Sequence, residues 1–512
     1  MPQAVDWIAH HARVTPQALA QVDLASGRRF TYREMNDRVG RLAAHLISLG
    51  VCPGDRVGFL AMNSTDIMEA VFATWRIGAV SLALNFRLTA PELEFIVNDA
   101  GPKVLVIDQD FAELASELRE LTDVPHWLST DGRGGQTPYE DALAAATPLA
   151  GKTVRQPLSD QCMLMYSSGT TGRPKGVIIS HEMMLYSAVH AMAFAGVNAD
   201  KVNFAVMPLF HIGGLNVFTC PVLYAGGATI IQRSFEPGAA LDVFNDPALG
   251  VTHFLGVPAI YNALKLHPKN GETDFSRLEC ALAGAEAVPD AIVHWWHERG
   301  LKIQEGYGMT ETAASSCMLP RDDVPARVGS AGKALMHCEM KIMGEDRQEA
   351  APGELGELWM RGPVITPGYW NRPDANEESF VEGWFRSGDI AKIDAEGYVY
   401  IEDRLKDMYI SGGENVYPAE VENVLYELDA VAEVAVIGVP DSQWGEVGCA
   451  IIAVKEGHEL NMADIAAHCE TRLAKFKRPA HMTLTTALPR NATGKVLKFE
   501  LRKSVPEQLD LK

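Results

Sequence analysis

Apolar and polar residues alternate along roughly the first 400 positions in a pattern typical of strands separated by helices. The segments 56–60 and 103–107 are short and largely apolar, as buried strands are. Between them, residues 67–77 place apolar side chains at helical spacing. This alternation predicts an α/β fold whose large N-terminal part is built from layered, largely parallel sheets.

The end of the chain follows a different pattern. After Pro418, which suits the first turn of a helix, apolar residues recur at helical spacing, at Val421, Val424, Leu425 and Leu428. The segments 434–437 and 450–454 are apolar and predict strands, and 463–473 predicts a second helix. We therefore expect a small α+β domain after the larger one, and 512 residues suffice for both.

One loop is rich in glycine and hydroxyl side chains. Residues 167–176 read Ser-Ser-Gly-Thr-Thr-Gly-Arg-Pro-Lys-Gly and lie between apolar runs at 163–166 and 177–179, which predicts a strand, a loop and a strand. Backbone N–H groups of such a loop can surround a polyphosphate, and Lys175 adds a positive charge. The P-loop of kinases and GTPases differs, because its lysine follows glycine and opens a helix.

Composition narrows the function classes. The net charge of −21 argues against a nucleic-acid partner, because an acidic surface repels phosphates. The eight cysteines are scattered without a CxxC pair, which predicts a reducing, cytoplasmic setting and no zinc site. The first residues do not resemble a signal peptide, and no apolar run is long enough to span a bilayer. Peripheral membrane contact stays open, as does the choice between a monomer and a homodimer.

Taken in order, five motifs resemble the adenylate-forming superfamily, which includes acyl-CoA synthetases, hydroxycinnamate–CoA ligases, luciferases and the adenylation domains of peptide synthetases. The motifs are residues 167–176, 304–311, 384–389, 403–407 and 489–495. The resemblance implies a large N-terminal domain at 1–403, a hinge at 404–406 that pivots on Lys406, and a small mobile C-terminal domain at 407–512.

The resemblance implies an AMP-forming acyl-CoA synthetase. Such an enzyme joins a small carboxylic acid to AMP, releases pyrophosphate, and then passes the acyl group to coenzyme A, with ATP and Mg²⁺ required. Lys495 is implied as the mobile catalytic lysine and Glu311 as the Mg²⁺ ligand, with Thr310 and His211 also in catalytic positions. Tyr307 would stack on adenine, and Asp389 would accept hydrogen bonds from the ribose. The implied ATP- or AMP-binding residues are Ser167, Ser168, Gly169, Thr170, Thr171, Lys175, Gly284, Ala285, Glu286, Gln304, Gly306, Tyr307, Asp389 and Arg404.

The resemblance also implies sites for the acid and for coenzyme A. The implied acyl pocket consists of His211, Gly213, Gly214, Asn216, Gly256, Val257, Gly308 and Met309. The implied CoA contacts are Gly412, Gly413, Trp444, Phe476 and Arg478. Several glycines at wall positions suggest a deep or wide slot, and the motifs are very similar to those of soluble bacterial fatty-acyl-CoA synthetases. A medium- or long-chain fatty acid is therefore favoured as the substrate.

Alternatives remain open at this point. An aryl acid of the hydroxycinnamate or ferulate type is the main one, because such ligases resemble this chain in having an asparagine at position 216, although they usually carry tyrosine in place of Gly213. A peptide-synthetase adenylation domain would need an acidic residue where this chain has His211 and glycines. A luciferase-like oxygenase shares the adenylating residues. An inactive nucleotide-binding scaffold is the alternative from a different class.

Overall fold

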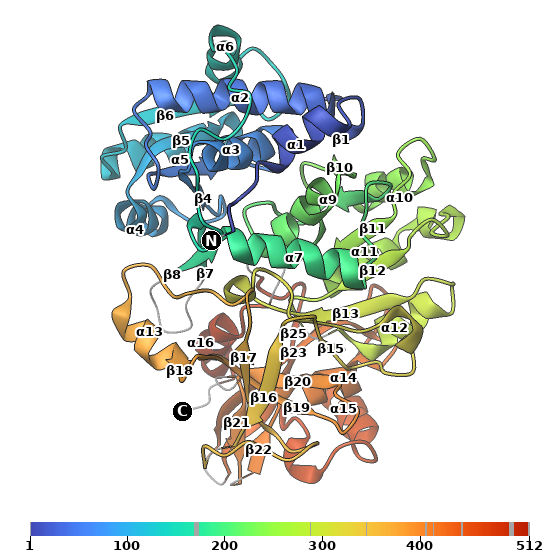
Figure 1. Ribbon diagram of the computed structural model, residues 1–512. Helices are drawn as coiled ribbons and strands as arrows, with labels where there is room; N and C mark the ends of the chain where they lie inside the picture. The colour runs from blue at the N-terminus through green and yellow to red at the C-terminus, as the bar shows by residue number, and fades with distance from the viewer. Residues whose placement is uncertain are drawn as a thin grey trace.

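The computed structural model describes residues 2–167, 174–286, 288–344, 346–404, 407–412, 414–441, 444–490 and 496–509, except for the side chains of residues 403 and 404. The described residues form four sheets. The N-terminal half of the chain, blue to green, occupies one end of the molecule and the orange and red C-terminal part the other (Figure 1).

The first sheet has six strands in the order β6-β5-β3-β4-β7-β8. All neighbours pair in parallel except β7 and β8, which are antiparallel. The strands are β3 (Arg56–Leu60), β4 (Val80–Ala83), β5 (Pro102–Asp108), β6 (His126–Thr130), β7 (Gln161–Ser167) and β8 (Lys175–Ser180). The strands predicted at 56–60 and 103–107 are confirmed, and the helix predicted at 67–77 is α3 (Thr65–Arg76).

The second sheet has nine strands in the order β15-β14-β13-β12-β11-β9-β10-β1-β2. Strands from β13 to β1 run parallel, and antiparallel strands close both edges. Because β11, β12 and β13 are parallel neighbours, the segments that follow them meet at one edge of the sheet. The strands are β1 (Leu19–Asp23), β2 (Arg29–Thr31), β9 (Val202–Ala205), β10 (Ala228–Ile231), β11 (His253–Gly256), β12 (Cys280–Ala283), β13 (Ile303–Tyr307), β14 (Cys317–Met318) and β15 (Lys333–Ala334).

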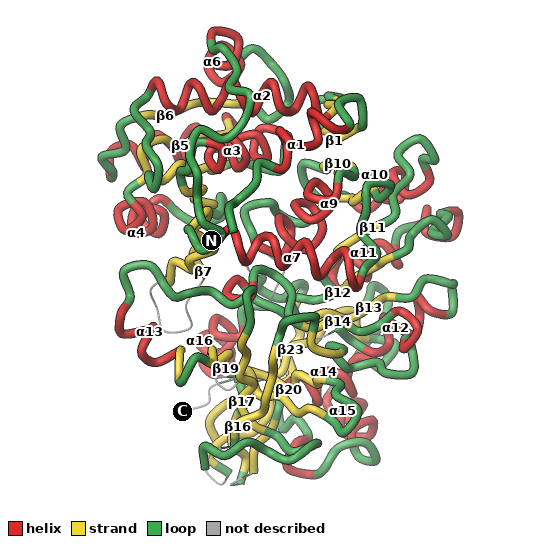
Figure 2. Tube along the Cα trace, in the orientation of Figure 1, coloured by secondary structure: helices red, strands yellow, loops and turns green. Residues whose placement is uncertain are grey.

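Helices cover these two sheets, and Figure 2 shows them concentrated in the N-terminal part of the molecule. They are α1 (Trp7–Val14), α2 (Tyr32–Ser48), α4 (Ala90–Ala100), α5 (Ala112–Leu121), α6 (Pro138–Ala145), α7 (His181–Phe194), α8 (Ile212–Gly214), α9 (Cys220–Ala225), α10 (Pro237–Asn245), α11 (Pro258–Leu266) and α12 (Asp290–His297). Short 3₁₀ helices are η1 (Gln109–Phe111), η3 (Pro268–Glu272), η4 (Thr310–Thr312) and η5 (Arg321–Asp323), and η2 (Leu215–Thr219) is π-helical. None of the described helices could cross a membrane, since none combines the required length and apolarity.

Largely parallel sheets were predicted for the first 400 residues, and for the third sheet this prediction is wrong. Its strands, β16 (Glu339–Met343), β17 (Gly356–Arg361), β18 (Phe380–Val381), β19 (Trp384–Ile393) and β20 (Val399–Arg404), pair antiparallel throughout. Parallel strands need long crossover connections, whereas this segment has mostly short turns and one helix, α13 (Pro373–Ser379). Figure 2 shows the resulting concentration of strands beside the C-terminal part.

The C-terminal sheet has the order β22-β21-β24-β23, with β25 on β24. Its elements are β21 (Tyr409–Ser411), β22 (Glu414–Val416), α14 (Pro418–Tyr426), β23 (Val431–Asp441), β24 (Gly445–Val454), α15 (Met462–Cys469), η6 (Lys475–Lys477), β25 (His481–Thr485) and α16 (Lys498–Gln508). The predicted α+β character is confirmed. The helix expected at 463–473 ends earlier, and the Arg478 guanidinium donates to the carbonyl oxygens of Glu470 and Leu473 at its end.

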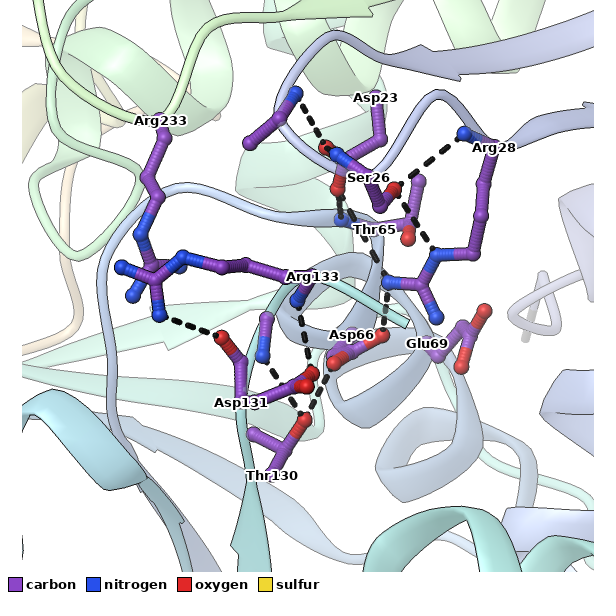
Figure 3. A network of polar contacts seen from close by, with 12 residues as sticks. Asp23, Ser26, Arg28, Thr65, Asp66, Glu69, Thr130, Asp131, Arg133 and Arg233 are labelled. Carbon is purple, nitrogen blue, oxygen red and sulfur yellow. Dashed lines mark hydrogen bonds and ion pairs between the residues drawn. The ribbon is translucent and has the colours of Figure 1, made fainter. Parts of the chain in front are cut away.

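A buried network of charged groups ties the first two sheets together (Figure 3). Asp66 on α3 accepts hydrogen bonds from Arg28, at 2.6 Å, and from Thr130 at the end of β6. Asp23 at the end of β1 accepts the backbone N–H of Thr65. Buried charges persist only with partners, so this network fixes α3 between the two sheets.

Candidate functional site

The predicted phosphate-binding loop connects two paired strands. Ser167 ends β7 and lies opposite Lys175, the first residue of β8, in an antiparallel pair. The two predicted strands are therefore confirmed. The predicted ligands Ser168, Gly169, Thr170 and Thr171 lie outside the described residues. The pairing places Ser167 and Lys175 together where the loop leaves the sheet.

Tyr369 links this hairpin to the predicted metal ligand. Tyr369 pairs with Val177 across an antiparallel bridge, and the Lys175 ammonium lies 5.0 Å from the centre of its ring. The Tyr369 hydroxyl donates to Glu311 Oε1 at 2.9 Å. Burial, reinforced by Glu311, raises the pKa of Tyr369, so this hydroxyl remains a donor. One aromatic side chain thus bridges the lysine and the carboxylate.

Thr310 and Glu311 lie in a single turn of 3₁₀ helix. After β13 the chain forms the single turn η4, where the backbone N–H of Met309 donates to the Thr312 hydroxyl. Ala313 and Ala314 follow with φ of +51° and +100°, in a region that alanine seldom occupies. Such strain is found at functional sites, where surrounding contacts hold it in place. The turn fixes the buried Glu311 carboxylate opposite Tyr369.

The predicted adenine and ribose residues are in direct contact. The Tyr307 hydroxyl, at the end of β13, donates to Asp389 Oδ2 at 2.6 Å. Ser387 accepts the backbone N–H of Asp389 and donates to a carbonyl of β17, and Gly388 has a φ of +71°. Arg404 on β20 lies opposite Asp389 on β19 in an antiparallel strand pair, and its side chain is not among those that the structure describes. The third sheet therefore delivers Asp389 to the end of β13.

The remaining predicted nucleotide residues lie on β12 and β13 or just after them. A Cβ at Gly284 would stand 2.6 Å from the carbonyl oxygen of Gly306, so the close approach of these strands requires glycine. Ala285 has a φ of +71°. The Gln304 side chain is paired within the sheet, with Leu319 O at 3.0 Å and Cys280 at 3.3 Å. Gln304 therefore has a packing role in this structure.

His211 directly precedes α8, and Asn216 lies in η2, which follows α8. Burial lowers the pKa of His211 to about 4, so the imidazole is neutral at neutral pH. Its Nδ1 accepts the N–H of Gly213 at 3.3 Å, which leaves the proton on Nε2. The Asn216 amide donates to the carbonyl of Ala313 at 2.8 Å, while its buried Oδ1 has no partner among the described residues. Asn216 thus connects the π-helical η2 to the Glu311 turn.

Close packing against backbone or side chains accounts for three of the four glycines predicted to line the acyl pocket. A Cβ at Gly214 would overlap the carbonyl oxygen of Pro208, and one at Gly308 would overlap that of Ala314. A Cβ at Gly256 would lie 3.0 Å from the Ile260 side chain. Gly213 differs, because a Cβ there would be no closer than 3.6 Å to its neighbours. The glycine count therefore does not measure the width of the slot.

The predicted CoA residues form two groups on the C-terminal domain. Trp444 packs on Gly412, where a Cβ would lie 2.8 Å from the indole, and the indole is 49% exposed. Phe476 packs against the domain core, and the Arg478 side chain is engaged with backbone carbonyls. Gly413, the hinge residue Lys406 and the predicted catalytic Lys495 lie outside the described residues.

Comparison with known proteins identifies the family. The profile described as AMP-binding enzyme matches residues 8–370, and that of the AMP-binding enzyme C-terminal domain matches residues 420–495. The chain belongs to the AMP-binding enzyme family. Within the adenylate-forming superfamily it falls in the acyl-CoA synthetase branch, as the motifs predicted. The two-domain α/β fold is also that of its structural neighbours.

Relatives in this family act on different acids. The chain is 39% identical to a feruloyl-CoA synthase of an Amycolatopsis species, with 97% of this chain and 98% of that protein covered. It is 35% identical to a long-chain-fatty-acid–CoA ligase of Mycobacterium tuberculosis, at the same coverage. ATP-bound MatB from Rhodopseudomonas palustris superimposes with a TM-score of 0.90 at 31% identity, over 99% of this chain and 100% of that one, and its apo form with 0.79.

The protein is thus an AMP-forming acid–thiol ligase that uses ATP, Mg²⁺ and coenzyme A. Its residues fit the metal requirement. Mg²⁺ is usually held by one or two carboxylates together with substrate phosphates. Glu311 is the carboxylate that could serve in this way, and the described residues contain no cluster of three or more His, Cys, Asp or Glu side chains.

Sequence reasoning missed Tyr369 and Arg490. Tyr369 lies in the segment Thr-Pro-Gly-Tyr-Trp, whose Pro-Gly pair signals a turn, but nothing in the sequence shows that it faces Glu311. Arg490 directly precedes the segment that carries Lys495, and its side chain reaches Glu286 in the N-terminal domain. Only the folded structure shows either contact.

Proposed function

We propose that this ligase activates a hydroxylated aromatic acid of the hydroxycinnamate class. The observation that carries the proposal is Asn216, whose Oδ1 is buried beside the Glu311 turn without a partner among the residues that the structure describes. An unpaired buried acceptor costs about 1–3 kcal/mol, which a phenolic O–H would recover and an alkyl chain would not. The 39% identity to a feruloyl-CoA synthase supports the same acid class.

The candidate site residues would divide the reaction between them. Lys175 and the loop beside it would hold the β- and γ-phosphates, while Tyr307 and Asp389 would bind adenosine. Glu311 would hold Mg²⁺, which supplies charge neutralisation at the phosphates. Lys495 would neutralise the carboxylate and α-phosphate as they meet, and most of the rate gain would come from this positioning and electrostatic stabilisation.

The second half-reaction would use the C-terminal domain. We retain the division into residues 1–403, a hinge at 404–406, and residues 407–512. Rotation about Lys406 would withdraw Lys495 and bring Gly412 and Trp444 to the acyl-AMP. The exposed indole packed on Gly412 offers an apolar wall for the pantetheine arm.

A fatty acid is the second candidate. Glycine at position 213 favours it, because hydroxycinnamate ligases usually carry tyrosine there. The 35% identity to a long-chain-fatty-acid–CoA ligase supports it as well. The glycines at positions 214, 256 and 308 do not support a fatty acid, since close packing accounts for them.

A substrate panel separates the two. The kcat/KM of CoA-dependent pyrophosphate release would be measured with 4-coumarate, ferulate, cinnamate, octanoate and palmitate. We expect the hydroxylated acids to exceed cinnamate by tenfold or more, as in other sites that bond a substrate hydroxyl. Asn216→Leu also removes the bond to Ala313 O, so it should lower turnover of every acid, but it should reduce the ratio of hydroxylated acid to cinnamate to near one. A maximum on octanoate or palmitate would establish the second candidate instead.

A further inference from the structure

Arg490 lies at the contact between the C-terminal and N-terminal domains. Its Nη2 donates to Glu433 Oε1 on β23 at 2.9 Å, within its own domain. Its Nη1 lies 3.4 Å from Glu286 Oε1, in the loop that follows β12 of the N-terminal domain. The three side chains are only 16–25% exposed, so water screens this ion pair less than it would an exposed one.

The backbone of Arg490 is anchored in the C-terminal domain. Arg490 pairs with Val496 in an antiparallel bridge, and the N–H of Leu497 donates to Pro489 O at 2.8 Å. Leu488 belongs to the apolar core shared by β23, β24 and α16, and the partly buried Val496 packs against that core. Because the backbone of Arg490 is held in the C-terminal domain, its guanidinium cannot stay in contact with Glu286 if the two domains rotate apart.

The other end of the ion pair is equally fixed. Glu286 follows Gly284 and Ala285, which are held by the close approach of β12 and β13 and by a left-handed backbone at Ala285. The contact between Arg490 and Glu286 can therefore form in only one orientation of the two domains. The whole chain in this orientation superimposes on ATP-bound MatB with a TM-score of 0.90, against 0.79 for apo MatB.

We propose that Arg490 is a positioning residue that latches the C-terminal domain onto Glu286 in the orientation that forms acyl-AMP, and that the latch opens for thioester formation. The proposal rests on the two-step function proposed above. Glu433 makes the latch reversible, because the guanidinium keeps one carboxylate partner in its own domain after Glu286 has moved away. When the contact with Glu286 breaks, the Arg490 guanidinium is therefore not left buried without a carboxylate partner.

The two half-reactions test the latch separately. Acyl-AMP formation from ATP and acid would be followed by pyrophosphate release in single-turnover mixing, and thioester formation by supplying synthetic acyl-AMP with CoA. Arg490→Gln should slow the first by about tenfold, the usual effect of losing one charge-assisted hydrogen bond. It should leave the second within twofold of the wild type. Arg490→Lys should recover part of the lost rate.

A double-mutant cycle identifies the partner. Glu286→Gln should slow acyl-AMP formation to a similar extent, and the double variant should be no slower than either single one. Arg472→Gln provides the matched control, since Arg472 forms a 2.8 Å ion pair with Glu427 inside the C-terminal domain. It should leave both half-reactions within twofold of the wild type.

Three results would overturn the latch: equal losses in both half-reactions of Arg490→Gln, no loss in the first, or multiplied losses in the double variant. Equal losses in Arg472→Gln and Arg490→Gln would also contradict it, because they would indicate a general effect on the domain. Failure of the wild-type protein to form acyl-AMP from any acid would instead refute the proposed function on which the latch rests.

Discussion

Tyr369→Phe removes one hydroxyl and tests whether that hydroxyl orients Glu311. The hydroxyl donates to Glu311 Oε1 at 2.9 Å in a site where Tyr369 is 6% exposed. The phenylalanine ring keeps the position beside the Lys175 ammonium, 5.0 Å from the ring centre in the wild type. The substitution therefore isolates a single hydrogen bond to the carboxylate that we propose holds Mg²⁺.

A hydrogen bond to a charged partner contributes about 1.5–3 kcal/mol. If that energy is used to hold Glu311 in place, its loss slows acyl-AMP formation by about 10- to 100-fold, since 1.36 kcal/mol is a factor of ten. A carboxylate free to turn also binds Mg²⁺ less well. We therefore expect the Mg²⁺ concentration at half-maximal rate to rise several-fold.

The assay is the initial rate of pyrophosphate release at saturating ATP and acid, measured across a Mg²⁺ titration. Tyr398→Phe is the matched control, because Tyr398 also donates to a carboxylate, that of Asp323, at 2.7 Å. We expect the control to leave the Mg²⁺ titration unchanged. If Tyr369→Phe changes the rate less than twofold and leaves the Mg²⁺ midpoint where it was, Tyr369 does not orient Glu311.

Three further predictions test other parts of the structure. Asp66→Asn removes a charge from the buried network and should lower the free energy of unfolding by about 3–5 kcal/mol in urea denaturation, whereas a loss below 1 kcal/mol would contradict the network's role. Burial raises the pKa of Glu305 to about 8, so the unfolded state releases this proton first and stability falls as pH rises from about 4.5 to 8. Glu305→Gln should flatten that part of the stability profile, and an unchanged profile would refute the assignment. Tyr307→Phe, which loses the 2.6 Å bond to Asp389, should raise the KM for ATP by about tenfold, with an unchanged KM as the contrary result.

The order of the motifs along the sequence pointed to residues that lie close together in the folded protein. Tyr307 and Asp389 are far apart in the sequence, yet they share a hydrogen bond because β19 delivers Asp389 to the end of β13. The paired strands on either side of the predicted phosphate-binding loop also followed from the sequence, since apolar runs flank a glycine-rich segment. Short sequence motifs and the strands beside them could therefore be predicted from the sequence.

Features that depend on packing were not predictable. Apolar alternation did not distinguish the antiparallel sheet at 339–404 from a parallel one, because strand direction depends on the connections as well as on the strands. Glycines at pocket positions suggested width, yet Gly214 and Gly308 serve close backbone contacts. The Arg490–Glu286 contact joins residues of two domains, and neither residue's local sequence indicates the other.

The most direct test of the whole account is to detect the intermediate. The protein would be incubated with ATP, Mg²⁺ and 4-coumarate without CoA, and the products identified by mass spectrometry before and after CoA is added. We expect coumaroyl-AMP and pyrophosphate to form first and CoA then to convert the adenylate into the thioester. An absence of acyl-AMP with every acid of the panel, or a thioester that forms without AMP, would contradict it.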